Sequence, residues 1–343
     1  MATDATGARD EPALPRSVSP AAEATAADGD FVGKRLLNLK TVLSFALAIV
    51  LLGVLVCTAQ VDLARTVEHI ARADPVLFAL AYVAYACTFP ARGLRWRRLM
   101  ANLGHPGMSV PHLMEVIFLS WFVNSILPGK VGDLYRGYLI RRNDRLPFSK
   151  TMGTILAERI IDTATLVIML GLSGIIVMHG RVTRELSSML QLGLVLILAM
   201  AVGLVLMWRL GPWLMRFFSA RIQTMYTLFT QGTFASFRAL PTVLAFTALA
   251  WLAEAGRLYL VTRAVHLSLD PVSALFVVAA ASLLLIVPTP GGLGAVEGGI
   301  VAMLVLLGAD KEVALSAAIL DRAISYWSLI VLGFPLYLFS RKT

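Results

Sequence analysis

The chain has 343 residues and a formal net charge of +9; 58% of its residues are hydrophobic and only 15% are charged. Average soluble proteins are about 45–50% apolar and about 25% charged, so this chain has too little polar surface to cover soluble cores. The composition indicates a polytopic membrane protein and excludes a secreted domain, a cytosolic enzyme and a nucleic-acid-binding protein. The arginines cluster beside apolar segments, which favours anionic lipid headgroups as partners rather than nucleic acid.

The chain opens with a polar segment and continues as a series of apolar ones. Residues 1–33 are mostly Ala, Asp, Glu, Thr, Ser and Pro, a composition that predicts a disordered cytoplasmic tail ahead of a membrane domain over 34–343. A helix that crosses a bilayer needs about 20 apolar residues. Full spans are predicted at 41–59, 76–94, 152–178, 189–208, 240–262 and 313–339.

Two further apolar regions, 111–140 and 272–308, are broken at their centres by "LPGKVGD" and "VPTPGGLG". Proline removes a backbone donor and glycine permits tight-turn backbone, so Pro128, Pro290, Gly291 and Gly294 are predicted to form hairpin turns. Each region is either two short spans or one re-entrant hairpin, and the breaks come before a full span is complete, which favours hairpins. The predicted fold class is an all-α polytopic membrane protein with about six full spans and two re-entrant hairpins, or eight or more segments by hydropathy.

The loops alternate in charge. Basic residues gather before the first span, after the second, after the first broken region and between 209 and 238, whereas the intervening loops are neutral or acidic. By the positive-inside rule this pattern predicts cytoplasmic N- and C-termini in the cytoplasmic (inner) membrane.

The sequence also carries an internal duplication. At an offset of 162 residues, Arg95 falls on Arg257, and the residues of the first break fall on those of the second: Pro128, Gly129, Gly132 and Gly137 on Pro290, Gly291, Gly294 and Gly299. At an offset of 163, Glu158-Arg159 falls on Asp321-Arg322. Each half, about 34–180 and 181–343, contains three full crossings, an odd number, so the halves are predicted to have opposite orientations. Inverted repeats with broken helices are typical of alternating-access transporters.

Charged residues inside the spans are candidate functional groups. Glu158, Arg159 and Asp162 lie on one long apolar helix, and Asp321-Arg322 repeats the pattern in the second half. Such residues cost about 2.5–3.5 kcal/mol each at membrane depth and are retained when paired or used. Glu158, Asp162 and Asp321 are interpreted as gating or ion-pair residues, and Arg159 and Arg322 as headgroup ligands; a purely structural ion pair is the alternative.

The first hairpin resembles a site for an anion. Gly129 and Gly132 offer backbone amides near a helix N-terminus, Arg136 follows about one turn later, and Asn124 precedes the break. Helix N-termini bind anions, and the arginine fork suits phosphate. The alternative places Arg136 at the interface, in cytoplasmic water.

In the second hairpin Glu297 stands where the first has Tyr135, and no cation matches Arg136. Glu297 therefore suits a protonatable gate, a cation or a headgroup amine; a hydrogen-bonded structural role is the alternative. Arg257, three residues after Glu254, is a further candidate headgroup ligand. The scattered histidines and cysteines predict no metal site, and no motif predicts a cofactor or a catalytic residue.

Five strings, "RGLRWRRL", "NSILPGKVGDLYR", "AERIID", "PTPGGLGAVEGG" and "LDRAISYW", resemble the lysylphosphatidylglycerol synthase transmembrane-region family, also called flippase-like domain proteins. The resemblance covers about 35–343. It implies an all-helical membrane domain with re-entrant helices. In multiple peptide resistance factors this domain is fused to an aminoacyl transferase and moves the aminoacylated lipid across the membrane.

This chain shows no such transferase, so the resemblance implies translocation without synthesis, and no enzyme activity is predicted. The cargo stays open between a phospholipid, an aminoacyl lipid and an isoprenoid-linked lipid, with a separate lipid-modifying enzyme as a second partner. Two alternatives remain: a non-transporting scaffold that recruits or regulates such an enzyme, and a membrane-embedded isoprenoid-phosphate transferase.

Overall fold

The computed structural model describes residues 39–59, 61–179 and 184–340, and this part of the chain is helical without a β-strand. The predicted tail at 1–33 lies outside it. The helices of the first half are α2 (Leu39–Ala59), α3 (Leu63–Ala71), α4 (Pro75–Ala86), α5 (Thr88–Asn102), α6 (Val110–Ile126), α7 (Val131–Asp144) and α8 (Phe148–Val177). Those of the second half are α9 (Arg184–Arg209), α10 (Gly211–Met215), α11 (Ala220–Ala235), α12 (Leu240–Ala264), α13 (Pro271–Leu283), α14 (Ala295–Leu306), α15 (Lys311–Arg322) and α16 (Ser328–Phe339).

Five helical stretches of the described chain are long and apolar enough to cross a membrane: 75–102, 148–177, 187–209, 220–264 and 311–339. They coincide with five of the six predicted spans, and α2, with 21 residues, occupies the sixth. The segment 209–238 differs from the prediction, because it was expected to be a loop and instead forms α10, α11 and a 3₁₀ turn. α11 continues through the 3₁₀ turn almost directly into α12, so this segment extends a span.

Acidic N-caps fix where several helices begin. Asp62, Asp74 and Asp270 each accept hydrogen bonds from backbone amides of the first turn of α3, α4 and α13. Proline follows Asp74 and Asp270, where its missing N–H is not needed. At Asp270 the Ser273 hydroxyl also donates to the carboxylate, and these bonds hold the pKa of Asp270 below its ordinary value of 3.8. These capped starts gather at one end of the bundle.

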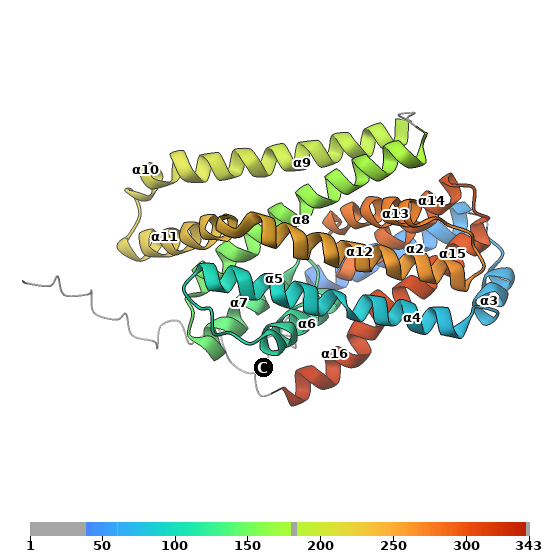
Figure 1. Cartoon of the computed structure of the whole chain (residues 1–343), viewed down its shortest axis with the longest axis horizontal. Coiled ribbons are helices and arrows are strands. Elements are labelled where there is room, and N and C mark those ends of the chain that lie inside the picture. The colour runs from blue at the N-terminus through green and yellow to red at the C-terminus, as the bar shows by residue number, and fades with distance from the viewer. Residues whose placement is uncertain (1–38, 60, 180–183, 341–343) are drawn as a thin grey trace, which may run out of the picture.

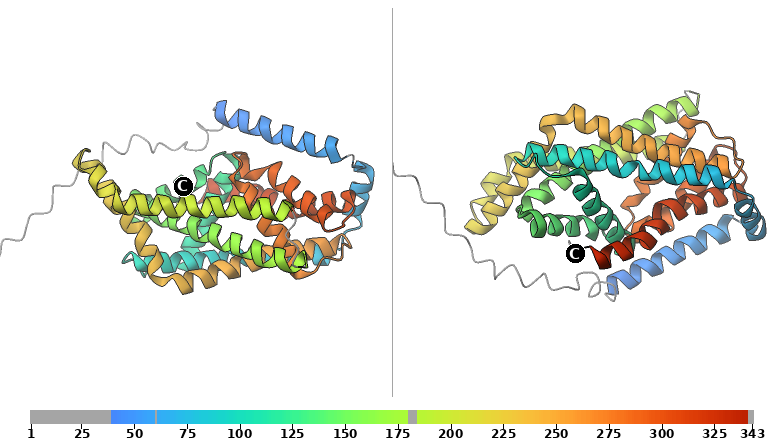
Figure 2. Two further views of the ribbon diagram at one scale, coloured as in Figure 1. Left: turned by 90° about the horizontal axis from the view of Figure 1, so that it is seen from above. Right: turned by 60° about the horizontal axis from the view of Figure 1, so that its bottom comes forward.

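Equivalent elements of the two halves run in opposite directions (Figure 1). The α4–α5 pair and α12 lie side by side and antiparallel, and the same reversal relates α8 to the α15–α16 segment. Shifting 75–102 by 162 residues gives 237–264, almost the bounds of α12. The helices α2 and α9 also run in opposite directions, and α2 lies at the margin of the bundle (Figure 2). The fold therefore is an inverted repeat.

Both broken regions form hairpins of helices too short to cross a bilayer. The helices α6 and α7 have 17 and 14 residues, and α13 and α14 have 13 and 12, below the about 20 that a crossing needs. The two hairpins start from opposite ends of the bundle, and their turns meet inside it. There the Tyr326 hydroxyl donates to the Ser125 carbonyl at 2.9 Å, joining the halves.

The turns require glycine at two positions. A Cβ on Gly132 would lie 1.9 Å from the Ser120 carbonyl oxygen, so only glycine lets α6 and α7 approach this closely. Gly291 has φ of +55°, in the left-handed region that glycine occupies without steric cost. A Cβ there would lie 2.5 Å from the ring of Tyr326.

Candidate functional site

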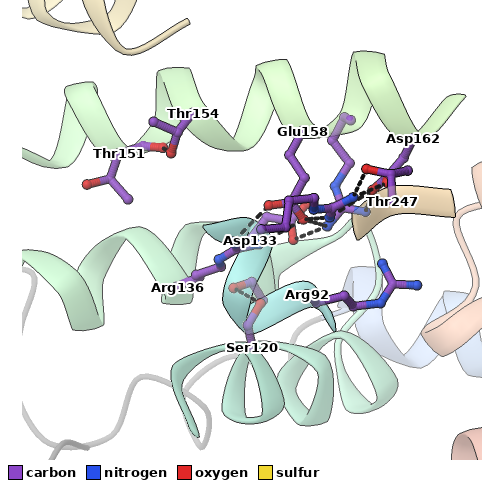
Figure 3. Close-up of polar contacts among 12 residues, drawn as sticks. Arg92, Ser120, Asp133, Arg136, Thr151, Thr154, Glu158, Asp162 and Thr247 are labelled. Carbon is purple, nitrogen blue, oxygen red and sulfur yellow. Dashed lines mark hydrogen bonds and ion pairs between the residues drawn. The ribbon is translucent and has the colours of Figure 1, made fainter. Parts of the chain in front are cut away.

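Four charged side chains form a cluster in the first half. Arg95 on α5 donates to Asp162 at 2.5 Å and lies 2.8 Å from Glu158, both on α8. Arg136 on α7 binds both oxygens of the same Glu158, at 3.1 and 2.8 Å. Figure 3 shows Arg136, Glu158 and Asp162 converging along α8. The sequence spacing predicted paired charges on α8, and the structure supplies the arginines from two other helices.

Arg159 lies at the edge of this cluster. Its closest carboxylate is Asp133 at 3.1 Å, while Glu158 and Asp162 are both 3.9 Å away. Its side chain is 29% exposed, against 1% for Arg136. Arg159 is therefore the member of the group that a ligand reaches most easily.

The second half holds an equivalent cluster. Arg257 on α12 binds both oxygens of Asp321 on α15, at 2.8 and 3.1 Å, and also pairs with Glu254. The neighbouring Arg322 donates to Glu297 at 2.8 Å and to the Gly291 carbonyl at 2.8 Å. Glu254, three residues before Arg257 on the same helix, thus pairs with it.

The repeat relates these contacts to one another. Arg257 is equivalent to Arg95 at the offset of 162, and Asp321 is equivalent to Glu158 at 163. The ion pair Arg257–Asp321 is therefore the counterpart of the ion pair Arg95–Glu158. Thr247, which accepts from Arg95 at 3.0 Å, stands 162 residues after Tyr85, and the Arg257 guanidinium lies 5.4 Å from the centroid of the Tyr85 ring. Thr247 and Tyr85 thus occupy the same position of the repeat, and each contacts the repeat-related arginine of the other half.

Arg92 and Glu254 are themselves equivalents at the offset of 162, and they form an ion pair of 3.4 Å. Figure 3 shows Arg92 pointing away from the first cluster. Its guanidinium lies 4.6 Å from the ring centroid of Trp121 and 5.5 Å from that of Trp251. Because equivalent positions of an inverted repeat meet only at its pseudo-twofold axis, this pair marks that axis.

A cavity of about 560 Å³, here called the central cavity, lies between the two hairpin turns. Residues of both turns line it, among them Asn124 and Gly129 of the first and Thr289 and Gly291 of the second, and so do Leu196 and Met200 of α9. Its charged lining consists of Arg92, Lys130, Arg159, Asp162, Glu254, Arg257, Asp321 and Arg322. Five of these are basic and three acidic, so the lining favours an anion.

Several buried polar atoms of the lining have no hydrogen-bond partner within the described residues. They are Arg92 Nε, Arg159 Nε, Trp251 Nε1, Thr289 Oγ1 and Ser325 Oγ. Buried polar groups are nearly always hydrogen-bonded. Their gathering around one cavity indicates that it accommodates a polar group.

The predicted site residues divide between this lining and its support. Those that line the cavity are Asn124, Gly129, Arg159, Asp162, Arg257, Gly291, Asp321 and Arg322. Those outside the lining are Pro128, Gly132, Arg136, Glu158, Pro290, Gly294 and Glu297. Their binding and gating roles stay predictions.

The residues outside the lining hold the hairpins in place. Arg136 stacks on Trp96, 3.5 Å from its ring centroid, in addition to its two bonds with Glu158. The Gly132 amide donates to the Asn124 side chain at 2.7 Å, and the Gly294 amide donates to Glu297 at 2.7 Å. Gly132 and Gly294 are equivalent in the repeat, and the backbone amide of each is hydrogen-bonded to a side chain of its own hairpin.

Tyr85, Lys130, Trp121 and Trp251 line the cavity but are not among the site residues predicted from the sequence, where Arg92 counts only among the basic residues after the second span. The offset of 162 gave a usable signal for Arg92 and Glu254, which align as oppositely charged residues inside equivalent spans. Trp251 falls on Phe89 at the same offset and Trp121 on Leu283, and apolar residues paired with apolar ones inside a span gave no signal of a polar site. Among residues 39–59, 61–179 and 184–340, no group of three or more His, Cys, Asp or Glu side chains is placed to hold a metal ion.

Comparison with known proteins connects the fold to a family. Residues 41–333 match the model of the lysylphosphatidylglycerol synthase TM region. A UPF0104 membrane protein of Methanocaldococcus jannaschii is 28% identical over 214 residues, covering 62% of this chain and 91% of the relative. Another, of Pyrococcus horikoshii, is 24% identical over 334 residues, covering 89% and 98%.

The glycosyltransferase AglD of Haloferax volcanii is 26% identical over 332 residues, which are 84% of this chain and 52% of the relative. The chain thus spans about half the length of that glycosyltransferase. With a family match that runs through both hairpins and both charged clusters, the chain belongs to the lysylphosphatidylglycerol synthase transmembrane-region family.

Proposed function

We propose that this protein moves a phosphate-bearing lipid between the leaflets of the cytoplasmic membrane, without synthesising it. The observation that carries the proposal is the central cavity, which lies where the two inverted hairpins meet and is lined by five basic residues and by unpartnered polar atoms. A phosphate is the common anionic group of membrane lipids. Arginine binds it through a planar fork of N–H donors.

The surroundings of the central cavity suit a lipid rather than a soluble anion. Leu196 and Met200 of the sparsely packed α9 line one side, and Leu285 and Ile286 of the second hairpin are exposed beside it. An acyl chain can lie along this apolar side while the headgroup occupies the polar interior. This division matches the amphiphilic shape of the proposed cargo.

The inverted repeat supplies a route from one side to the other. In transporters of this architecture, one repeat moves against the other around a fixed central site. Here the Arg92–Glu254 pair lies at the axis, and Tyr326, between α15 and α16, donates to Ser125 beside the first turn. We infer that these contacts separate and re-form as the cavity opens alternately to each side.

We further infer that the chain does not catalyse a transfer reaction. The three carboxylates of the cavity are all held by arginines: Asp162 by Arg95, and Glu254 and Asp321 by Arg257. A carboxylate so held is a weak base. A separate lipid-modifying enzyme would supply the cargo.

The proposal is tested by leaflet accessibility in liposomes that contain the pure protein and one labelled lipid at a time: phospholipids, aminoacyl lipids and polyprenyl phosphates. Arg159→Gln removes the most accessible cationic group of the cluster, and we expect the flux of phosphate-bearing cargo to fall about tenfold, the value of one charged hydrogen bond. Arg98→Gln, an exposed arginine outside the cavity, is the matched control and should retain the parent rate.

Three results would count against the proposal. If correctly inserted Arg159→Gln protein moves lipid as fast as the parent, translocation does not depend on this residue of the cavity. A covalently altered lipid that appears only with an added sugar or aminoacyl donor would instead identify an embedded transferase. The absence of flux for every lipid, together with dispensable cavity residues, would favour the scaffold alternative.

A further inference from the structure

A second pocket, here called the basal pocket, lies at the end of the bundle where the predicted cytoplasmic loops gather. It has a volume of about 540 Å³ and lies between the end of α5, the start of α8, the end of α9 and the length of α11. None of its lining residues lines the central cavity. It is therefore a separate site, and it does not rest on the proposed translocation.

The polar groups of the basal pocket are donors for an anion. Lys150 and Arg238 are its charged lining residues, and no acidic side chain is among them. Lys150 Nζ donates to the Leu103 carbonyl at 3.3 Å, which leaves its other N–H groups for a ligand. Asn102 Nδ2 is buried and has no partner among the described residues.

Close helix packing fixes the backbone of Lys150, and the bond to the Leu103 carbonyl orients its ammonium group. A Cβ on Gly232 of α11 would lie 2.0 Å from the Lys150 carbonyl oxygen, and one on Gly153 of α8 would lie 2.1 Å from the Phe229 carbonyl oxygen. The backbones of α8 and α11 therefore touch next to Lys150. A ligand binding there meets a preformed position, which lowers the entropy lost on binding.

The repeat shows that the fold itself does not require these donors. At the offset of 162, Lys150 corresponds to Glu312, Arg238 to Val76 and Asn102 to Ala264. At the equivalent place Glu312 accepts a hydrogen bond from the Asp62 amide at 3.3 Å. The cationic pocket is thus a feature of one end of the molecule only.

The rim of the basal pocket is apolar and exposed. Trp208 and Phe234 line it and are 60% and 37% exposed, and Trp213 and Phe217 are exposed on the adjoining segment. Tryptophan at a span end marks the membrane–water interface. Basic pockets between helices on the cytoplasmic side bind the headgroups of acidic lipids.

We propose that the basal pocket binds the phosphate of an anionic phospholipid of the cytoplasmic leaflet, with Lys150, Arg238 and Asn102 Nδ2 as donors. The bound lipid covers the rim with its acyl chains and ties α9 and α11 to α5. The same phosphate chemistry exists in free phosphate, and the apolar rim favours the lipid.

The test measures lipid retention by native mass spectrometry of the full chain, purified from nanodiscs that contain phosphatidylglycerol and phosphatidylcholine. Lys150→Gln with Arg238→Gln should lower retained phosphatidylglycerol about thirtyfold, because both charged donors to the phosphate are lost. Asn102→Asp, which adds one negative charge, should lower it in the same direction. Arg209→Gln with Arg216→Gln removes two exposed arginines of the same end and should leave retention within about twofold of the parent.

Three outcomes would overturn the proposal. Unchanged retention of phosphatidylglycerol in the double variant, or an equal loss in the arginine control, would show that Lys150 and Arg238 only set the orientation of the chain and do not bind the lipid. Loss of the retained lipid on adding excess inorganic phosphate, with phosphate itself binding in lipid-free micelles, would assign the pocket to a soluble anion. Variants of the central cavity such as Arg159→Gln should retain the parent amount of phosphatidylglycerol, which keeps this result separate from the translocation test.

Discussion

The arginines around Glu158 and Asp162 differ in how far they are exposed to the central cavity. Arg95 and Arg136 are 1% exposed and are held by carboxylates on α8. Arg159 is partly exposed and faces the central cavity. The sequence identified the charges on α8 and α15 because charge inside an apolar span is expensive and rare. It did not identify their partners, because Arg136 and Glu158 are 22 residues apart and meet only once the hairpin folds back.

Arg136 is the residue for which this distinction gives a clear prediction. Arg136→Ala leaves Glu158 short of one of its two close arginines, and breaking a buried ion pair costs about 3–5 kcal/mol. We expect a large drop in the thermal unfolding midpoint of the protein in detergent. Arg98→Gln should leave that midpoint unchanged. Normal stability of Arg136→Ala combined with weakened binding of phosphate-bearing lipids would instead support the direct headgroup role that the sequence suggested.

At the scale of elements, the hairpins were well predicted and the short helices were not. The Pro-Gly breaks fix the turns because their backbone cannot continue a helix, and they lie where the sequence placed them. The helices α3, α10 and α11 were missed, since short or amphipathic helices carry a weaker apolar signal than a span. Hydropathy left open whether each broken region forms two spans or one hairpin. The helices of both regions are too short to span a bilayer, so each region forms a hairpin.

The close contact inside the first hairpin leads to a prediction at the same scale. Gly132→Ala places a Cβ within 1.9 Å of the Ser120 carbonyl oxygen and 2.7 Å of the Asn124 side chain. The helices α6 and α7 must separate, which also weakens the Asn124–Gly132 hydrogen bond at the turn. We expect reduced thermal stability and slower lipid flux together. Gly107→Ala, in a loop where a Cβ meets nothing within 4 Å, is the control; equal behaviour of the two variants would show that the hairpin tolerates a wider spacing.

At the scale of the whole molecule, the structure joins two halves that run in opposite directions. The predicted cytoplasmic loops gather at one end and the neutral or acidic loops at the other (Figure 1). The duplication was visible in the sequence through a constant offset. The exchange of contacts between halves, such as Arg95 with Thr247 and Arg257 with Tyr85, was not, because it depends on how the halves pack.

Sidedness is tested by single cysteines in a background that lacks Cys57 and Cys87. A cysteine at Gly107 should react with a membrane-impermeant thiol reagent only from the cytoplasmic side, and one at Ser187 only from outside. Gly107 follows the last residue of α5, and Ser187 lies in the first turn of α9. These two helix ends lie near opposite ends of the bundle. Labelling of both from the same side would contradict the inverted orientation.

The central claim is that a lipid headgroup passes through the cavity between the two halves, and the most direct measurement is flux with that cavity filled. Ser282→Trp introduces a large side chain into the lining, whereas Ala201→Trp adds the same side chain at an exposed position of α9 outside it. In liposomes with a labelled phosphate-bearing lipid, we expect Ser282→Trp to abolish exchange between leaflets and Ala201→Trp to match the parent. Full exchange by a correctly folded Ser282→Trp protein would contradict the account.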